Sequence, residues 1–177
     1  DFVNVVFDQS SLMTLEKSLG NISDPLLKQM LWATLWTMVR HAQLPAQKFS
    51  QLAMTQLKME KDLGVLQLGL DYLIGSFWYM SPELKKGYRH SVEEFVSDLF
   101  KTVPVKDPIK IALFSRYLAV VRSDSATQMI RGWLNQEEIH SGFKIDQERR
   151  WAIVFRLAAN GSPEAHDLIK AELARDK

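Results

Sequence analysis

The four histidines are the side chains whose spacing says most about metal chemistry. His41, His90, His140 and His166 lie far apart in the sequence. A zinc-hydrolase helix places two histidines one turn apart with a glutamate beside the first, because both rings must reach one ion while the carboxylate activates its water. Residues 137–140, Glu-Glu-Ile-His, have a Glu-x-x-His spacing, but a two-metal bundle needs a second such motif. We therefore expect His140 to lie in a solvated loop.

The other familiar catalytic patterns are also missing from this sequence. The pairs Glu93-Glu94 and Glu137-Glu138 are adjacent, so on a helix their carboxylates diverge instead of facing one another. Gly64, Gly69 and Gly75 are not followed by the lysine and hydroxyl residue of a phosphate-binding loop. The sequence has no cysteine, which excludes thiolate ligands, a thiol nucleophile and disulfides.

Two adjacent arginines are the best candidates for ligand contact. Arg149 and Arg150 precede Trp151, and an arginine beside a large aromatic ring can hold a carboxylate or stack on the ring. We predict that they lie in a substrate groove. The alternative is that Asp146 or Glu148 pairs with an arginine locally.

Composition narrows the class of protein. The 177 residues carry 22 Lys and Arg against 21 Asp and Glu, so no net field draws in nucleic acid or acidic lipid, and we expect neither partner. No apolar run approaches the roughly 20 residues that cross a bilayer, and the first residues lack a signal-peptide pattern. The absence of cysteine fits a reducing cytosol or a secreted protein without bridges. Of these compartments we predict the cytoplasm.

The clearest structural element is a helix over residues 23–42. Ser23 and Asp24 can cap its first N–H groups, and Pro25 suits the first helical position. One predicted apolar face comprises Leu27, Met30, Leu31, Thr34, Leu35 and Met38. Trp32, Trp36 and Val39 form a second stripe, which we assign to the core. Such a helix must be covered on two sides.

Similar helices are predicted before and after this one. Apolar spacing and caps predict them at residues 12–19, 49–57, 62–77, 81–101, 107–121, 123–134, 146–158 and 162–173. Four of the predicted helices, among them the one over residues 23–42, begin with a polar residue followed by proline: Asp24-Pro25, Ser81-Pro82, Asp107-Pro108 and Ser162-Pro163. The glycines of residues 62–77 indicate close approach of another backbone, and residues 135–145 read as a polar loop with Gly142 at its bend.

These elements predict an all-α fold. Consecutive short antiparallel helices with wide apolar faces are typical of stacked helical hairpins, since each pair leaves a face that the next must cover. We expect an irregular, HEAT-like α-solenoid, preceded by a β-like segment at residues 2–7, which are rich in β-branched and aromatic residues.

Several stretches together resemble a known family. They are residues 22–26, 31–40, 44–46, 130–134, Asp146 with Arg150-Trp151, 156–159 and 171–176. In this order they resemble the C-terminal helical domain of zinc-dependent aminopeptidases of the aminopeptidase N and endoplasmic-reticulum aminopeptidase type. The similarity covers almost the whole chain.

The resemblance implies that this chain is one domain of a larger polypeptide. Residues 1–9 would join a preceding β-domain, and residues 10–177 would be a helical domain that encloses the substrate chamber and restricts peptide access. The family's zinc ligands and catalytic residues belong to preceding domains, so no catalytic or metal-binding residue is carried over here. The implied partners are those domains and a peptide. A free-standing interaction scaffold and an enzyme with an unfamiliar site remain alternatives.

We predict that the isolated 177-residue chain neither binds zinc nor hydrolyses peptides, because it lacks a recognisable ligand set. Zinc titration by calorimetry, combined with a leucyl-anilide assay, tests this. Stoichiometric binding heat or turnover would contradict it.

Overall fold

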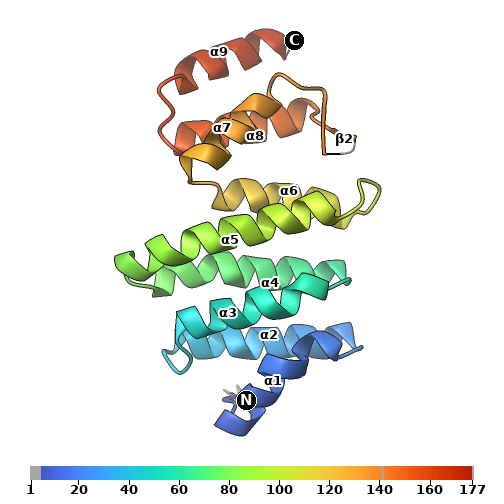
Figure 1. The fold of residues 1–177 in the computed structure, drawn as a ribbon, viewed down its shortest axis with the longest axis vertical. Coiled ribbons are helices and arrows are strands. Elements are labelled where there is room, and N and C mark those ends of the chain that lie inside the picture. Colours follow the sequence, from blue (N-terminus) through green and yellow to red (C-terminus); the bar gives the residue numbers. More distant parts are fainter. Residues whose placement is uncertain (1–4, 141, 177) are drawn as a thin grey trace. The chain divides into compact units, whose positions relative to one another are not determined.

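Helices make up nearly all of the regular structure in a computed structural model of the chain, which describes residues 5–140 and 142–176 (Figure 1). Within those ranges the α-helices are α1 Gln9–Ser18, α2 Pro25–Arg40, α3 Ala46–Gln56, α4 Leu63–Gly75, α5 Pro82–Thr102, α6 Ile109–Val120, α7 Asp124–Trp133, α8 Gln147–Ala159 and α9 Ala165–Arg175. The predicted all-α class is confirmed. The chain divides into two compact units, Asp1–Tyr88 and Arg89–Lys177, with the boundary inside α5.

The predicted β-like segment is not a strand where the structure describes it. Residues 2–4 lie outside the described ranges, and Val5, Val6 and Phe7 are irregular. Val5 and Val6 are about half exposed, at 49% and 48%. The backbone N–H of Phe7 reaches the Sδ of Met38 on α2 at 3.5 Å.

Across the described residues, no helix combines the length and the apolar character needed to cross a membrane.

Capping side chains explain where several helices begin. The Oδ1 of Asp24 accepts hydrogen bonds from the N–H groups of Leu26 and Leu27, at 2.9 and 3.2 Å, and Pro25 is the first residue of α2 as predicted. These bonds satisfy donors that have no partner within the helix. Ser123 caps α7 in the same way through Ala126 N, at 3.2 Å.

Two of the four predicted starts are wrong by one or two residues. Helix α6 begins at Ile109, after Pro108, and the Asp107 carboxylate accepts from Ile109 N at 2.9 Å. Helix α9 begins at Ala165. There the carbonyl of Ser162 accepts from Ala165 N at 3.0 Å, so the chain makes a separate turn before the helix.

The first unit buries parts of both predicted apolar stripes of α2 and leaves part of the first stripe exposed. The buried residues of α2 are Lys28, Trp32, Leu35, Met38 and Val39, which pack toward α3 and α4. Leu27 and Met30, on the first stripe, are 44% and 60% exposed. The large indole decides the orientation, because full burial of Trp32 against Phe49, with ring centroids 5.9 Å apart, removes more apolar surface from water.

Trp36 and the α4 glycines define the other contacts of this unit. Trp36 is half-buried and stacks on Tyr72 with centroids 5.1 Å apart. A Cβ at Gly75 would lie 3.1 Å from the Trp36 ring, and one at Gly69 would lie 2.5 Å from a methyl of Leu57. The glycines therefore admit neighbouring side chains, whereas the sequence predicted a neighbouring backbone.

The second unit contains a small β-hairpin where a polar loop was predicted. Strands β1 Glu138–Ile139 and β2 Phe143–Lys144 pair antiparallel, with Ile139 opposite Phe143. Ile139, Phe143 and Ile145 are buried. The alternation of these apolar residues with polar ones pins the hairpin to the core, where the Phe143 ring lies 5.4 Å from those of Phe100 and Phe114.

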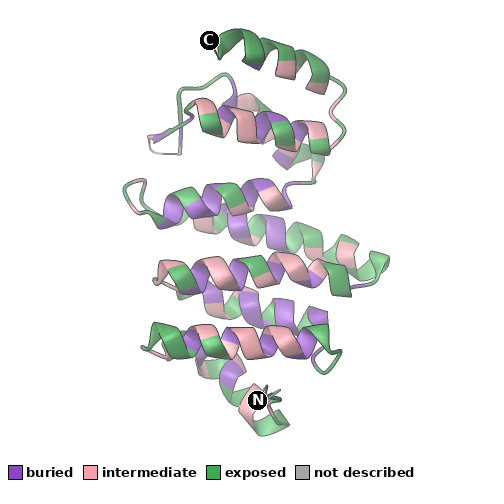
Figure 2. Cartoon of the chain, turned by 180° about the vertical axis from the view of Figure 1, so that it is seen from behind, coloured by how far each residue is buried: buried purple, intermediate pink, exposed green. Residues whose placement is uncertain are grey.

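Helix α9 is attached to α8 largely through charge. Most residues of α9 are coloured as exposed in Figure 2. Its buried residue is Glu172, whereas Leu173 is 60% exposed. The guanidinium of Arg150 on α8 donates to both oxygens of Glu172, each at 2.7 Å. Together with the half-buried Leu168 and Ile169, this two-pronged ion pair holds α9 in place.

The two methionines of α2 provide a matched test of its orientation. Replacing Met38, which is 1% exposed, with alanine should lower the free energy of unfolding by about 2–5 kcal/mol, because a cavity remains. Replacing Met30 should change it by less than about 0.5 kcal/mol. Urea denaturation of the chain measures both. A larger loss for Met30→Ala than for Met38→Ala would contradict this burial pattern.

The Arg150–Glu172 pair predicts a second contrast between neighbouring residues. Arg150→Met removes the cation that pairs with the buried Glu172 carboxylate and leaves it only the neutral Gln147 amide, so it should cost about 3–5 kcal/mol. Arg149→Met should cost about 1 kcal/mol or less because its ion pair is more exposed. The double variant Arg150→Met/Glu172→Leu should recover most of the loss. Equal losses for the two arginines, measured by urea denaturation, would refute this.

The same pair predicts a pH dependence. The hydrogen bond from Arg150 lowers the pKa of Glu172 below its ordinary 4.5. The pair therefore stabilises the fold above pH 4.5 and loses that contribution as the pH falls through the folded-state pKa. Denaturation of wild type and of the double variant between pH 6 and 3 should show the additional acid sensitivity in wild type alone. Parallel curves would contradict it.

Candidate functional site

The two predicted groove residues have partners within the second unit. Arg150 is buried, and besides Glu172 it donates to the carbonyl of Leu134 at 2.6 Å. Arg149 donates to Asp146 at 2.5 Å and lies over the Phe143 ring, 4.6 Å from its centroid. The local pairing with Asp146 is thus observed. Contact of either arginine with a peptide stays a prediction, and the occupied guanidinium of Arg150 disfavours it.

The adjacent glutamates diverge as predicted. Glu93 is 6% exposed, whereas Glu94 is exposed. The Glu93 carboxylate accepts from the N–H groups of Arg122 and Ser123, at 2.7 and 3.0 Å, and from the Ser123 hydroxyl. Its role is to tie α5 to the start of α7.

His140 is not in a solvated loop. Its ring is half-buried against Phe100 and Trp133, and its Nε2 is enclosed without a hydrogen-bond partner. Over residues 5–140 and 142–176, no three histidine or carboxylate side chains gather in a way that could hold a metal ion.

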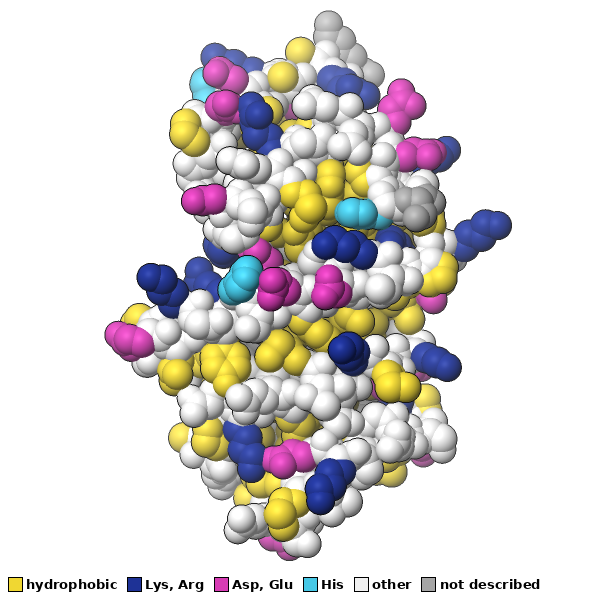
Figure 3. Space-filling model, viewed as in Figure 1, with side chains coloured by type: hydrophobic (Ala, Val, Ile, Leu, Met, Phe, Trp, Pro, Cys, Tyr) yellow, Lys and Arg dark blue, Asp and Glu magenta, His cyan; other side chains and the backbone are white. Residues whose placement is uncertain are grey.

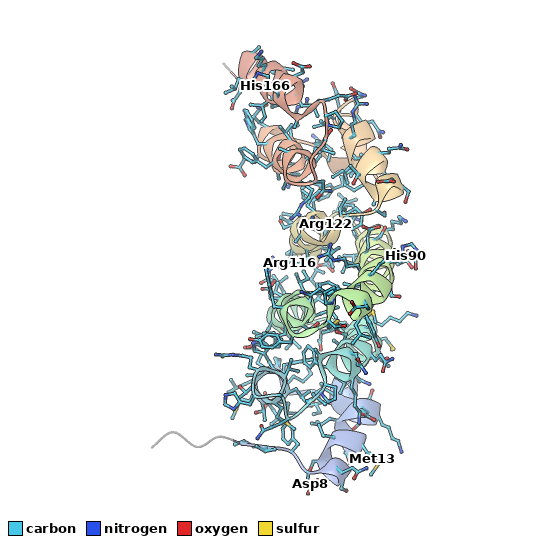
Figure 4. The ribbon with its side chains drawn as sticks, turned by 90° about the vertical axis from the view of Figure 1, so that its left-hand side faces the viewer. Asp8, Met13, His90, Arg116, Arg122 and His166 are labelled. Atoms are coloured by element: carbon cyan, nitrogen blue, oxygen red, sulfur yellow. The ribbon has the colours of Figure 1, made fainter. Side chains whose placement is uncertain are left out.

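A pair of arginines that the sequence analysis missed lies at the junction of α6, α7 and α8. Arg122 follows α6 (labelled in Figure 4) and donates through Nη1 to the carbonyl of Val121 at 2.7 Å and to Asn160 Oδ1 at 2.9 Å. Burial lowers the pKa of Arg122, and Arg89 lowers it further, although Glu93 opposes this. Burial, and then the charge of Arg122, lower the pKa of Arg156.

The charge of Arg122 therefore disfavours the charged form of Arg156 at a partly buried position. Sequence gives only a weak signal for this pair: Arg156 on α8 lies four residues before Asn160, which caps that helix, but nothing in the spacing places Arg122 beside them.

A groove of about 360 Å³ lies between α6 and α8. Small and apolar side chains line it: Ser115, Leu118, Ala119, Ala152, Phe155 and Ala159. The groove is open because the alanine and serine side chains are too short to fill the space between the two helices. Phe155 is 61% exposed at the rim, and Arg156 adds a positive charge to the lining.

A second groove, of about 480 Å³, lies between α7 and the α8–α9 connection. Arg122, Asn160 and Thr127 contribute to its lining, and Arg131 pairs with Glu164 across it. On the face drawn in Figure 3, side chains of both charges are interspersed with hydrophobic ones.

The geometry of the α6–α8 groove suits non-covalent binding. Its hydroxyl, Ser115, has no histidine or carboxylate in the lining that could activate it as a nucleophile. An apolar floor beside a guanidinium can accept an apolar side chain and a neighbouring carboxylate.

Comparison with known proteins agrees with the resemblance stated above. Residues 1–177 match the family described as the ERAP1-like C-terminal domain. The chain is also similar to a protein named aminopeptidase N from Streptomyces lividans, with 26% identity over 177 residues. That alignment covers 99% of this chain and 20% of the relative, so the chain spans about a fifth of the relative's length. The chain belongs to the ERAP1-like C-terminal domain family.

Proposed function

We propose that this chain is the helical C-terminal domain of a longer zinc-dependent aminopeptidase, where it encloses the substrate chamber and controls peptide access. The observation that carries the proposal is the match to an ERAP1-like C-terminal domain along the entire chain. The similarity to a protein named aminopeptidase N supports the same assignment. Zinc and the reacting groups would lie in domains outside these residues.

The contribution of this chain would be binding and enclosure. A wall of helices that closes over a bound peptide excludes water and limits the orientations of the peptide, and both effects raise turnover without a reacting group. The α6–α8 groove is the surface that we assign to peptide contact. Its floor would hold an apolar side chain, and Arg156 would attract a carboxylate of the peptide.

An interaction scaffold remains the second candidate. Exposed apolar side chains such as Trp78, at 84%, and Met59, at 83%, favour some protein contact by the first unit. Within the main proposal the same residues would face other domains of the longer polypeptide. A cytoplasmic location is part of the proposal, as is the absence of nucleic-acid partners.

Kinetics of the longer enzyme with substrates of different length test the groove. Arg156→Gln should raise KM for peptides of eight to ten residues by about three- to tenfold, the effect of losing about 1 kcal/mol of contact. It should leave kcat/KM for an amino-acid anilide unchanged, because the anilide is too short to reach the groove. Arg175→Gln, on the exposed end of α9, is the matched control.

Two results would count against the proposal. Unchanged kinetics with every substrate would remove the groove from peptide contact. An equal loss with anilide and peptide would mean that Arg156 supports the fold and not the length-dependent binding.

A further inference from the structure

His140 occupies an unusual position in the second unit. It follows β1, and its backbone φ of +38° lies in the left-handed region that a residue with a side chain seldom adopts. The imidazole stands edge-on to the rings of Phe100 and Trp133, with centroids 5.4 and 5.6 Å apart. Packing of the ring against this cluster thus holds the hairpin in place despite the backbone strain.

A buried lysine shares the Phe100 ring with this histidine. The Nζ of Lys110, on α6, lies 4.4 Å from the Phe100 centroid. It donates to the carbonyls of Phe100 and Val103 at the C-terminal end of α5, the second at 3.0 Å. The ammonium therefore satisfies carbonyls that α5 leaves unpaired, and it places a positive charge close to the imidazole.

The surrounding charges oppose a second cation here. Burial, and then Lys110 and Lys101 on α5, lower the pKa of His140 below its ordinary 6.5. On the α8 side, Arg149 lies over Phe143. On the hairpin itself, Glu138 is exposed and is paired in register with Lys144.

The enclosed Nε2 adds a geometric reason. It has no hydrogen-bond partner among the described residues. A neutral ring can leave this nitrogen without a proton, but an imidazolium carries N–H donors on both nitrogens. Protonation would therefore bury a donor without an acceptor beside two lysines.

We propose that His140 is a protonation-controlled latch, which holds the β1–β2 hairpin against the C-terminal end of α5 when neutral and releases it when charged. The latch depends only on residues of the second unit and is independent of the proposed function. It offers a way in which acidification could alter this surface without unfolding the helices.

Proton linkage gives the direction in which pH changes the population of the released hairpin. The released histidine has its ordinary pKa of 6.5, and the packed one has a lower pKa. Between those values, release takes up one proton, so the population of the released hairpin should rise about tenfold for each unit of falling pH. Above pH 6.5 it should not change.

Amide exchange of Ile145 reports the latch directly, because its N–H donates to the carbonyl of Glu137 beside the hairpin, at 2.8 Å. Exchange is measured by NMR on the full chain from pH 7.5 to 5. His140→Phe keeps the edge-on packing but cannot be protonated. The ratio of wild-type to His140→Phe exchange at each pH removes the intrinsic effect of pH, and it should rise about tenfold per unit below 6.5.

Two further variants keep the test decisive if His140→Phe is poorly folded. Lys101→Gln, at an exposed position, should move the midpoint of the His140 ring titration toward 6.5. His90→Gln, at an exposed position on α5 (Figure 4), should leave the pH dependence of Ile145 amide exchange unchanged. A pH-independent exchange ratio would overturn the proposal, and so would an ordinary midpoint for His140 that Lys101→Gln does not shift.

Discussion

The structure depends on one constraint, which is that the middle helices of each unit are apolar on more sides than one neighbour can cover. In α4, Val65, Leu70 and Leu73 are completely buried, and α2 and α3 both pack against this helix. In α8, Ile153 and Leu157 are likewise completely buried, and α6, α7 and α9 are its neighbours. Since burial of apolar area is the main favourable term in folding, a single hairpin of this kind is not stable alone. Consecutive hairpins must therefore pack together within each unit.

Buried charges occur where the apolar layers meet helix ends. Glu93 accepts from two backbone N–H groups that start α7, and Lys110 donates to two carbonyls that end α5. These side chains satisfy backbone groups that would otherwise be buried unpaired. Two buried charges pair with side chains instead: Lys28 with Glu60, and Glu172 with Arg150. The attachment of α9 through Glu172 is therefore sensitive to charge.

The sequence was sufficient for elements whose signals are local. Capping by Asp24 and Asp146 and the presence of the helices depend on residues within a few positions of one another, and the structure agrees with them. Which residues of the two apolar stripes of α2 are buried could not be obtained in this way, because it depends on packing around Trp32. The hairpin at Ile139 and Phe143 was missed because its strands are two residues long.

The candidate site was the least predictable part. Arg149 and Arg150 were candidates because they adjoin a tryptophan, yet they bind other parts of the chain: Asp146, Leu134 and Glu172. Arg122 and Arg156 come from separate segments that only the packing of α6 against α8 brings together. Side-chain clusters of this kind depend on tertiary contacts, and no periodicity of a single sequence encodes them.

In the proposed function, these residues contribute shape and peptide contact to chemistry that other domains perform. Photo-crosslinking tests this proposal most directly. A ten-residue peptide with a reduced first peptide bond and benzophenone side chains is irradiated with the longer aminopeptidase, and the labelled residues are identified by mass spectrometry. The account predicts labels in α6 and α8, around Leu118 and Phe155. Labelling confined to other domains, with none in these 177 residues, would contradict it.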